Sequence, residues 1–324
     1  MKILVIRFSS IGDIVLTSPI VRCLHNKYPK SEIHFLTKDK FVELVENNPN
    51  VSAVHSINGT NDTAIFNNLK TEKYDLVIDL HKNLRTRKLK RLLNAPKWYS
   101  FKKLNIQKWL LVNFKINFLP KKHIVDRYFD CLKGLNIVND KVGIDFHFPQ
   151  GFTMDLGKYN LDNGGYSVVV IGGTYRTKQI PKNLLLSIFK RLNGSIIMIG
   201  GGNDDEQKAK ELQESYPNSN LVNLCNTLSI DESAYLIKNA KTLYTSDTGM
   251  MHIASAFDTQ IEAIWGNTNP AFGMYAYRPS GVNIDDHIVS LKCNPCSKLG
   301  SNICPRGHFK CMNMQNVEQI VKNC

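Results

Sequence analysis

The sequence lacks any long hydrophobic run. No stretch of its 324 residues approaches the ~18 consecutive apolar residues that indicate a membrane-spanning helix. The apolar run at the start, Ile3–Ile6, is too short for the core of a secretory signal, and Arg7 and Asp13 interrupt the segment after it. Hydrophobic residues make up 43% and charged residues 21%, so we expect a folded, cytoplasmic protein rather than a disordered chain.

Acidic residues are scarce in one part of the chain. Lys and Arg number 41 against 28 Asp and Glu, a net charge of +13. Residues 1–160 hold 26 basic and 14 acidic residues, whereas residues 161–324 hold 15 and 14. The stretch Lys82–Lys122 contains 13 basic residues and no acidic one. A solvated face is the simplest interpretation, but this excess favours an anionic partner: nucleic acid, a membrane surface or a phosphorylated substrate.

Two common ligand-binding patterns are also missing. The sequence has no G-x-G-x-x-G, so the dinucleotide fingerprint is absent. Paired aspartates occur only at Asp204-Asp205, which opens a predicted helix, and at Asp285-Asp286, which lies near no other signal. We therefore expect no essential metal and no required cofactor.

Cysteines are sparse along most of the chain and concentrated at its end. Cys23, Cys131 and Cys225 stand alone, which suits a reducing compartment. The spacing of the tail cysteines resembles a four-thiolate zinc site with a loose second half, and buried reduced thiols or adventitious disulfides are the alternatives. The weak candidate ligands for structural zinc are Cys293, Cys296, Cys304 and Cys311.

What is present is a repeated alternation of β-strand and α-helix patterns. In the first half, Tyr74–Leu80 is the clearest strand, and Asp13–Tyr28 has the apolar periodicity of one helix. The pattern breaks around residues 146–165 at several Gly and Pro residues and then restarts. This predicts two doubly wound parallel sheets in tandem. The expected domains are residues 1–155, residues 165–290, and a Cys-rich tail, residues 291–324, that ends in a helix packing back toward the N-terminal domain.

Polar loops follow three of the predicted strands, where open parallel sheets bind ligands. In the first loop, Gly12 permits a tight turn after Ser9 and Ser10, and Asp13 is either a general base or a helix cap. The second loop combines glycines with Thr174, Arg176 and Lys178, which suits a diphosphate, although a solvated turn is the alternative. The third predicts an anion or sugar-hydroxyl site, or merely an N-cap, at Asp247, Thr248, Gly249 and His252.

Together these loops favour group transfer from a nucleotide-activated donor. A carboxylate in the first domain would deprotonate an acceptor hydroxyl, while the second domain's cations and helix N-termini stabilise the departing diphosphate. A nucleic-acid-binding protein is one alternative, because the stretch Lys82–Lys122 also contains aromatic residues. A sugar-nucleotide epimerase on the same fold is another.

Four segments resemble one known family. RFSSIGDIVLTSP at 7–19, GTYRTKQIP at 173–181, SDTGMMHIASA at 246–256 and the cysteine tail resemble motifs of the lipopolysaccharide heptosyltransferases, glycosyltransferase family 9. The resemblance implies a GT-B fold of two Rossmann-like domains facing a cleft. It also implies inverting, metal-independent transfer of a heptose from ADP-heptose to the lipopolysaccharide inner core.

The resemblance also implies roles for particular residues. Asp13 matches the proposed base, and Leu228 falls where an apolar residue lines the adenine slot. The second and third loops match contacts to the donor. The N-terminal domain takes the acceptor, an anionic phosphorylated glycolipid, at the inner face of the cytoplasmic membrane, and no nucleic acid is expected. The acceptor-binding candidates are Ser9, Ser10, Gly12, Lys82, Arg85 and Arg87.

Overall fold

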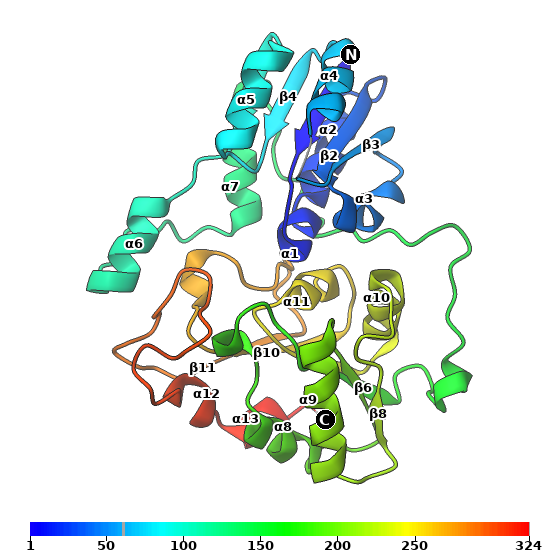
Figure 1. Ribbon diagram of the computed structural model, residues 1–324, viewed down its shortest axis with the longest axis vertical. Helices are drawn as coiled ribbons and strands as arrows, with labels where there is room; N and C mark the ends of the chain where they lie inside the picture. The colour runs from blue at the N-terminus through cyan, green and yellow to red at the C-terminus, as the bar shows by residue number, and fades with distance from the viewer. Residues whose placement is uncertain (60–61, 324) are drawn as a thin grey trace. The chain divides into compact units, whose positions relative to one another are not determined.

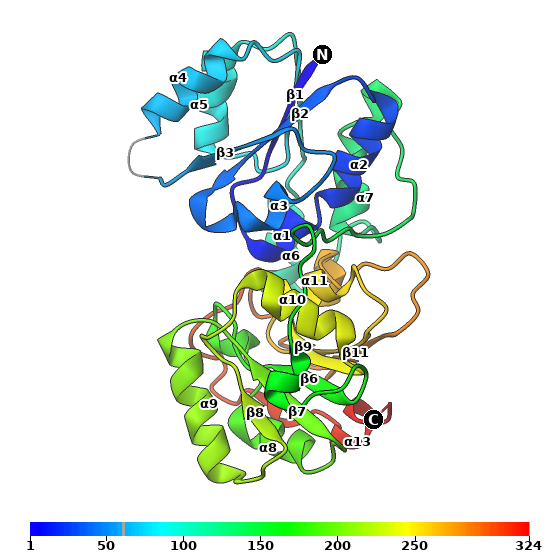
Figure 2. The ribbon, with the colours of Figure 1, turned by 90° about the vertical axis from the view of Figure 1, so that its right-hand side faces the viewer.

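The computed structural model describes residues 1–59 and 62–323. The chain divides into two compact units, each built on one parallel β-sheet covered by helices (Figures 1 and 2). Unit 1 comprises Met1–Leu104 and Lys122–Phe152, and unit 2 comprises Asn105–Lys121 and Thr153–Cys324. The predicted fold class, two doubly wound parallel sheets, is confirmed. Within the described residues, no helix is long and apolar enough to cross a membrane.

Unit 1 has a five-stranded sheet in the order β3-β2-β1-β4-β5, with every neighbouring pair parallel. Leu4 and Ile6 of β1 pack with residues of α4 and α5 on one face, and Ile3 and Val5 are buried on the other. This burial on both faces explains the continuous apolar runs of the central strands. The elements are β1 (Lys2–Ile6), α1 (Ile11–Val15), α2 (Ser18–Lys27), β2 (Glu32–Lys38), α3 (Glu43–Glu46), β3 (Ala53–Ile57), α4 (Thr63–Thr71), β4 (Leu76–Asp79), α5 (Leu84–Leu93), β5 (Lys97–Ser100) and α7 (Ile124–Asp130).

Unit 2 has a six-stranded parallel sheet in the order β11-β10-β9-β6-β7-β8. Side chains of α8, α9, α12 and α13 fill the core on one face, and those of α10 and α11 fill it on the other. The elements are α6 (Asn105–Phe114), β6 (Tyr166–Val170), α8 (Lys182–Phe189), β7 (Ser195–Ile199), α9 (Asn203–Ser215), β8 (Leu221–Asn223), α10 (Ile230–Asn239), β9 (Thr242–Ser246), α11 (Gly249–Ala254), β10 (Gln260–Trp265), β11 (Ile284–Ile288), α12 (Lys310–Asn313) and α13 (Val317–Ile320).

The predicted helix Asp13–Tyr28 is wrong as a single element. The chain forms α1 and α2 with a break at Leu16–Thr17, and Pro19 occupies the first turn of α2. Proline has no N–H to donate, so it fits a first turn but not a helix interior. The break leaves α1 as a single turn that presents Asp13 directly after β1.

The unit boundaries differ from the predicted domains in two places. Residues 105–121 fall within the predicted domain 1–155 but belong to unit 2. Lys115 Nζ ties this segment to the tail, because it donates to the carbonyls of Cys293 (2.9 Å) and Pro295 (2.6 Å). The tail also belongs to unit 2. Met312 and Ile320 are buried in its core against α8, so the last helix packs on unit 2.

Candidate active site

In unit 1, the turn after β1 holds the Asp13 carboxylate in place. Asp13 is the third residue of α1, and its Oδ2 accepts hydrogen bonds from the Ser10 backbone N–H at 3.3 Å and from Ser10 Oγ at 3.1 Å. The bond from the Ser10 N–H to Asp13 Oδ2 is one half of a capping box at the start of α1. The side chain of Asp13 nevertheless keeps 23% of its surface exposed. The carboxylate is therefore both a cap and reachable from solvent.

Arg7, which the sequence did not identify as a site residue, orders the surroundings of Asp13. Its Nη2 lies 2.6 Å from Asp13 Oδ1, its Nη1 donates to the Leu80 carbonyl at 2.6 Å, and its Nε donates to the Ser9 carbonyl at 2.9 Å. The residue is only 8% exposed. One buried guanidinium thus joins the ends of β1 and β4 and fixes the direction of the carboxylate.

His81 lies beside this cluster and is uncharged at neutral pH. Its ring meets that of Phe8 edge to face, with centroids 4.9 Å apart. Burial, and then the positive charge of Arg7, lower the pKa of His81 to about 3. Asp13 is therefore paired with the Arg7 guanidinium, and His81 adds no imidazolium to its neighbourhood at pH 7. The sequence did not indicate a role for His81, because a lone histidine after a strand has no distinctive pattern.

The predicted acceptor residues of unit 1 are only partly brought together. The Arg85 guanidinium lies over the Phe8 ring, 5.6 Å from its centroid, so it adjoins the turn that contains Ser9, Ser10 and the buried Gly12. Its Nε is 3.3 Å from Asp62 Oδ2. Lys82, just before α5, and Arg87, on α5, are both exposed. Arg85 is thus the member of the basic set placed nearest to the turn.

In unit 2, the loops after β6 and β9 adjoin each other. Lys178 Nζ lies 2.8 Å from Asp247 Oδ2, and both side chains are largely shielded from solvent, at 17% and 14% exposure. Thr248 Oγ1 lies 3.0 Å from Thr245 Oγ1. A Cβ on Gly173 would stand 3.9 Å from the Thr248 methyl group, which shows how closely the loops approach. The structure therefore unites Lys178, Asp247 and Thr248.

The other predicted donor residues surround this point or lie next to it in the chain. Thr174 and Arg176 are exposed on the loop after β6, with Arg176 opening a single 3₁₀ turn that includes Lys178. Thr248 is the N-cap of α11, Gly249 is its first residue, and His252 is buried one turn later. Leu228 is half-buried against the core and directly precedes Ser229, the N-cap of α10.

Two charged residues beneath these loops were not predicted as part of the site. The Lys208 ammonium donates to the carbonyls of Ile171 (2.9 Å) and Ile180 (3.0 Å), the two ends of the loop after β6. Burial lowers the pKa of Lys208 to about 8, although nearby Asp205 raises it. Asp205 is buried, accepts the Gly201 N–H at 2.9 Å, and leaves no space for a Cβ on Gly172. Gly172 therefore leaves room for the Asp205 carboxylate, a group of the protein itself.

The cysteine-bearing tail supports the same loop. Thr177 is buried, and its Oγ1 donates to the Ser301 carbonyl at 2.6 Å and accepts the Ser301 N–H at 2.9 Å. Gly300 has φ +116°, and a Cβ there would stand 2.6 Å from the Tyr175 ring. The tail thus holds the loop after β6 from one side, while Lys208 holds its two ends.

Among the described residues, one group of side chains is placed to hold a metal ion. The weak zinc candidates Cys293, Cys296, Cys304 and Cys311 do not form such a group, and burial raises the pKa of Cys311 to about 12. In unit 1, the ligand atoms of His34, His55 and Glu72 lie within 4.8 Å of one another. His34 Nδ1 is 2.9 Å from the Tyr74 hydroxyl and 3.1 Å from His55 Nε2, so this cluster already forms a hydrogen-bonded network.

Comparison with known proteins shows the family of the chain. The family model "Glycosyltransferase family 9 (heptosyltransferase)" matches residues 63–304. The chain belongs to glycosyltransferase family 9. It is therefore a glycosyltransferase, and the resemblance noted in its sequence is confirmed.

Individual members of the family match nearly the whole chain. Lipopolysaccharide heptosyltransferase 1 of Pseudomonas aeruginosa is 23% identical over 326 residues, covering 92% of this chain and 86% of that protein. A family 9 glycosyltransferase from Veillonella parvula superposes with a TM-score of 0.77 at 21% identity, covering 99% and 95% of the two chains. An E. coli heptosyltransferase solved with ADP gives 0.73 at 20% identity, with full coverage of both. The shared fold is the GT-B fold.

Proposed function

We propose that this glycosyltransferase moves a heptose, or a related sugar, from an ADP-sugar to a hydroxyl of the phosphorylated lipopolysaccharide inner core. Support comes from the similar lipopolysaccharide heptosyltransferase 1 and from the similar heptosyltransferase that was solved with ADP. The enzyme would work at the inner face of the cytoplasmic membrane. A nucleic-acid-binding protein and an epimerase are both less compatible with the family.

The observation that carries the donor half of this proposal is the pair formed by Lys178 and Asp247, at 2.8 Å. When the bond between sugar and diphosphate breaks, negative charge grows on the departing phosphate. A shielded ammonium stabilises such charge more strongly than an exposed one, because less water screens it. Thr174 and Arg176, both exposed on the same loop, supply further donors to the phosphates. This assignment needs no metal and no other cofactor.

Asp247 has a second role in this proposal. Without substrate, its carboxylate is the partner of Lys178. A bound diphosphate would pair with the Lys178 ammonium. The Asp247 carboxylate oxygens would then accept hydrogen bonds from sugar hydroxyls. Thr248 and Gly249, at the start of α11, would contribute a hydroxyl and a backbone N–H, and Leu228 would contact the base.

On the acceptor side, Asp13 is the proposed base. Inverting transfer requires a single base that removes the proton from the attacking hydroxyl while the diphosphate leaves from the opposite face of the sugar. Asp13 meets the requirement for exposure, since 23% of its side chain is open, and Arg7 fixes its orientation. Ser9, Ser10, Gly12 and the basic residues Lys82, Arg85 and Arg87 would bind the phosphorylated core.

The donor is tested by calorimetric titration of the wild-type enzyme with ADP-, UDP-, GDP- and CMP-linked ligands. We expect tightest binding of the ADP-linked ligand. Preference for another nucleotide would contradict the proposed donor without questioning the enzyme class. Loss of ADP affinity in Lys178→Gln, with folding retained, would support the phosphate assignment.

The base is tested with Asp13→Asn, which keeps the shape of the side chain and an acceptor for Ser10. We expect transfer to fall by at least ~100-fold, the usual contribution of general-base catalysis, with donor affinity unchanged within a few fold. Asp140→Asn is the matched control, because Asp140 also pairs with an arginine of unit 1, Arg22, at 2.7 Å. Turnover by Asp13→Asn close to the wild-type rate would rule out Asp13 as the base.

A further inference from the structure

Helix α6 is apolar on two sides, and only one of them is covered. Leu111 is buried, at 7% exposure, whereas Ile106 is 73% and Trp109 is 55% exposed. At 100° per residue, Ile106 and Trp109 share the face opposite Leu111. A helix on the surface of a globular protein normally buries one apolar stripe and presents polar residues elsewhere. The second stripe of α6 departs from that pattern.

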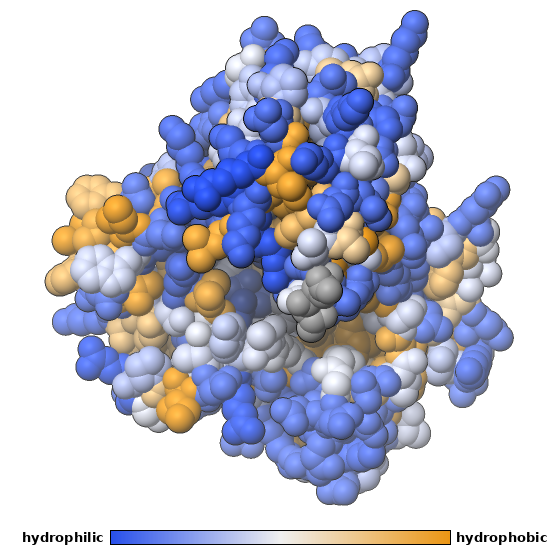
Figure 3. All heavy atoms as spheres, turned by 45° about the horizontal axis from the view of Figure 1, so that its top comes forward, coloured by the Kyte–Doolittle hydropathy of each residue, from blue (hydrophilic) through white to orange (hydrophobic). Residues whose placement is uncertain are grey.

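The exposed apolar surface continues past the end of the helix. Phe114 is 58% exposed, Ile116 is 47% and Phe118 is 66%, and the Phe114 ring meets that of Trp109 edge to face at 5.3 Å. We call these five residues, Ile106, Trp109, Phe114, Ile116 and Phe118, the α6 surface. Figure 3 shows hydrophobic side chains gathered at the edge of the molecule where α6 lies in Figure 1. Large apolar patches of this kind mark binding surfaces.

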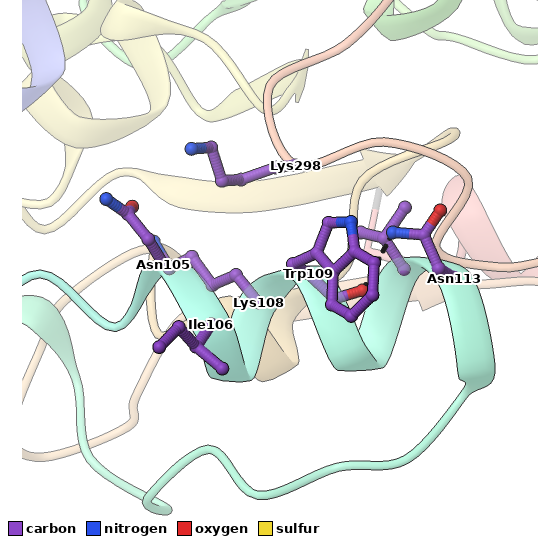
Figure 4. A pocket seen from close by; sticks show the side chains of 7 residues that line it. Asn105, Ile106, Lys108, Trp109, Asn113 and Lys298 are labelled. Atoms are coloured by element: carbon purple, nitrogen blue, oxygen red, sulfur yellow. Dashed lines mark hydrogen bonds between the residues drawn. The ribbon is translucent and has the colours of Figure 1, made fainter.

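The segment is anchored rather than loose, so its exposure belongs to the folded unit. Lys115 Nζ donates to the two carbonyls of the cysteine tail, and the Lys108 ammonium lies 5.8 Å from the Phe272 ring centroid. Between α6 and the tail is a groove of about 490 Å³ that includes Trp109, Asn113 and Lys298. In Figure 4, Trp109 and Asn113 lie on the side of the helix toward Lys298.

The charges around the α6 surface distinguish between partners. Lys102, Lys103, Lys121 and Lys122 flank it in sequence, all four are exposed, and no acidic residue occurs over residues 82–122. A second copy of this chain would bring a like-charged surface, which is unfavourable. Nucleic acid would use aromatic rings and cations, but the aliphatic Ile106 and Ile116 cannot stack on bases.

An anionic bilayer meets all of these features together. Exposed Trp, Phe and Ile side chains insert at the boundary between headgroups and acyl chains, and lysines pair with the anionic headgroups. We propose that the α6 surface seats this enzyme on an anionic phospholipid bilayer. The idea deepens the proposed function and rests on it, because an acceptor that is a membrane glycolipid would then meet an enzyme held at the same surface.

The test compares the full-length wild type with Trp109→Ser/Phe118→Ser. The matched control is Val138→Ser/Val142→Ser, because these valines are 79% and 72% exposed but lie in unit 1, outside the α6 surface. Each protein is sedimented with vesicles of phosphatidylcholine alone or mixed with phosphatidylglycerol. We expect the wild type and control to bind the mixed vesicles, and the α6 variant to bind them at least ten-fold more weakly.

Tryptophan fluorescence gives a second readout. Trp265 is buried at 1% exposure and Trp98 is half-buried, so a blue shift on mixing with anionic vesicles reports mainly Trp109. Failure of the wild type to bind, equal binding to neutral vesicles, or unchanged binding by the α6 variant would each overturn the proposal. So would concentration-dependent self-association that only the α6 variant loses.

Transfer to a water-soluble core oligosaccharide without acyl chains separates this inference from the proposed function. We expect the α6 variant to keep its rate on that acceptor, within about two-fold, and to lose rate only on acceptor presented in vesicles. If the wild type fails on both acceptors, the proposed function is wrong, whatever the vesicle binding shows.

Discussion

Replacing Lys208 with methionine tests whether one buried ammonium holds the donor loop. Methionine keeps the unbranched apolar stem and removes the group that donates to the Ile171 and Ile180 carbonyls. Because those carbonyls lie at the two ends of the loop that carries Thr174, Arg176 and Lys178, the substitution should loosen the loop without touching a ligand. We expect weaker donor binding with little change in the rate at saturating donor.

The size of the effect on the free energy of unfolding follows from the lowered pKa of Lys208. Lysine in the unfolded chain titrates near 10.5, whereas burial lowers the pKa of Lys208 in the folded protein to about 8. Between these values the folded protein has already released its proton and the unfolded chain has not. The unfolded state then binds more protons, so the free energy of unfolding rises with pH across this window. Integrated from pH 7 to pH 10, Lys208 alone adds about 2 kcal/mol.

The substitution should therefore affect the free energy of unfolding differently at pH 7 and at pH 10. At pH 7 the methionine variant gains stability because it no longer buries a charge. This gain offsets the loss of about 1–3 kcal/mol for each carbonyl left without a donor. At pH 10 that relief has largely vanished, so the variant should be less stable than the wild type by about 2 kcal/mol more than at pH 7. Groups common to both proteins cancel in the difference.

Urea unfolding of both proteins at several pH values measures this difference directly. Lys210→Met is the matched control. Lys210 lies on the same helix, is exposed and pairs with Glu206 along α9, at 2.8 Å, so its substitution should give a difference that is flat with pH. A flat difference for Lys208→Met as well would mean that Lys208 titrates like a surface lysine, and the reasoning would fail.

Three further outcomes are expected. Neutralising Lys82, Arg85 and Arg87 together should raise the KM for the acceptor and leave donor affinity unchanged; a change in donor affinity alone would contradict their placement on the acceptor side. Gly300→Ala should lower the free energy of unfolding by about 1–3 kcal/mol in urea denaturation, because the new Cβ meets the Tyr175 ring at φ +116°; unchanged stability would contradict that contact. Because the tail cysteines form no metal-binding group within the described residues, reduced protein should contain no stoichiometric zinc in metal analysis, and one equivalent of zinc would contradict this expectation.

The fold was readable from the sequence wherever strands are buried on both faces. The apolar segments at β1, β4, β6 and β10 have no other stable environment than a covered parallel sheet. The edge strands β3 (Ala53–Ile57), β5 (Lys97–Ser100) and β11 (Ile284–Ile288) were not predicted, since they are polar or short and acquire their conformation by pairing with a neighbour. The break between α1 and α2 was signalled by Pro19, but the apolar periodicity continues through it.

The candidate site was readable only in part. Glycines, hydroxyls and cations after strands predicted the two loops that we propose bind the donor, and the structure brings Lys178 of one loop to Asp247 of the other. Arg7 and Lys208 could not be found in this way. Their partners are mainly backbone carbonyls from distant segments, Leu80 in one case and Ile171 in the other, and a carbonyl has no sequence signature. Such contacts become visible only when the fold brings the segments together.

The course of the chain also determines how this enzyme can be dissected. The backbone passes between the units after Leu104, after Lys121 and after Phe152, so three peptide links join them instead of one. A single proteolytic nick cannot release either unit. A fragment starting at Thr153 would lack α6 and lose the lysine that ties the cysteine tail, whereas one fusing residues 105–121 to 153–324 would retain both. Isolating unit 2 intact therefore requires a rearranged gene rather than a truncated one.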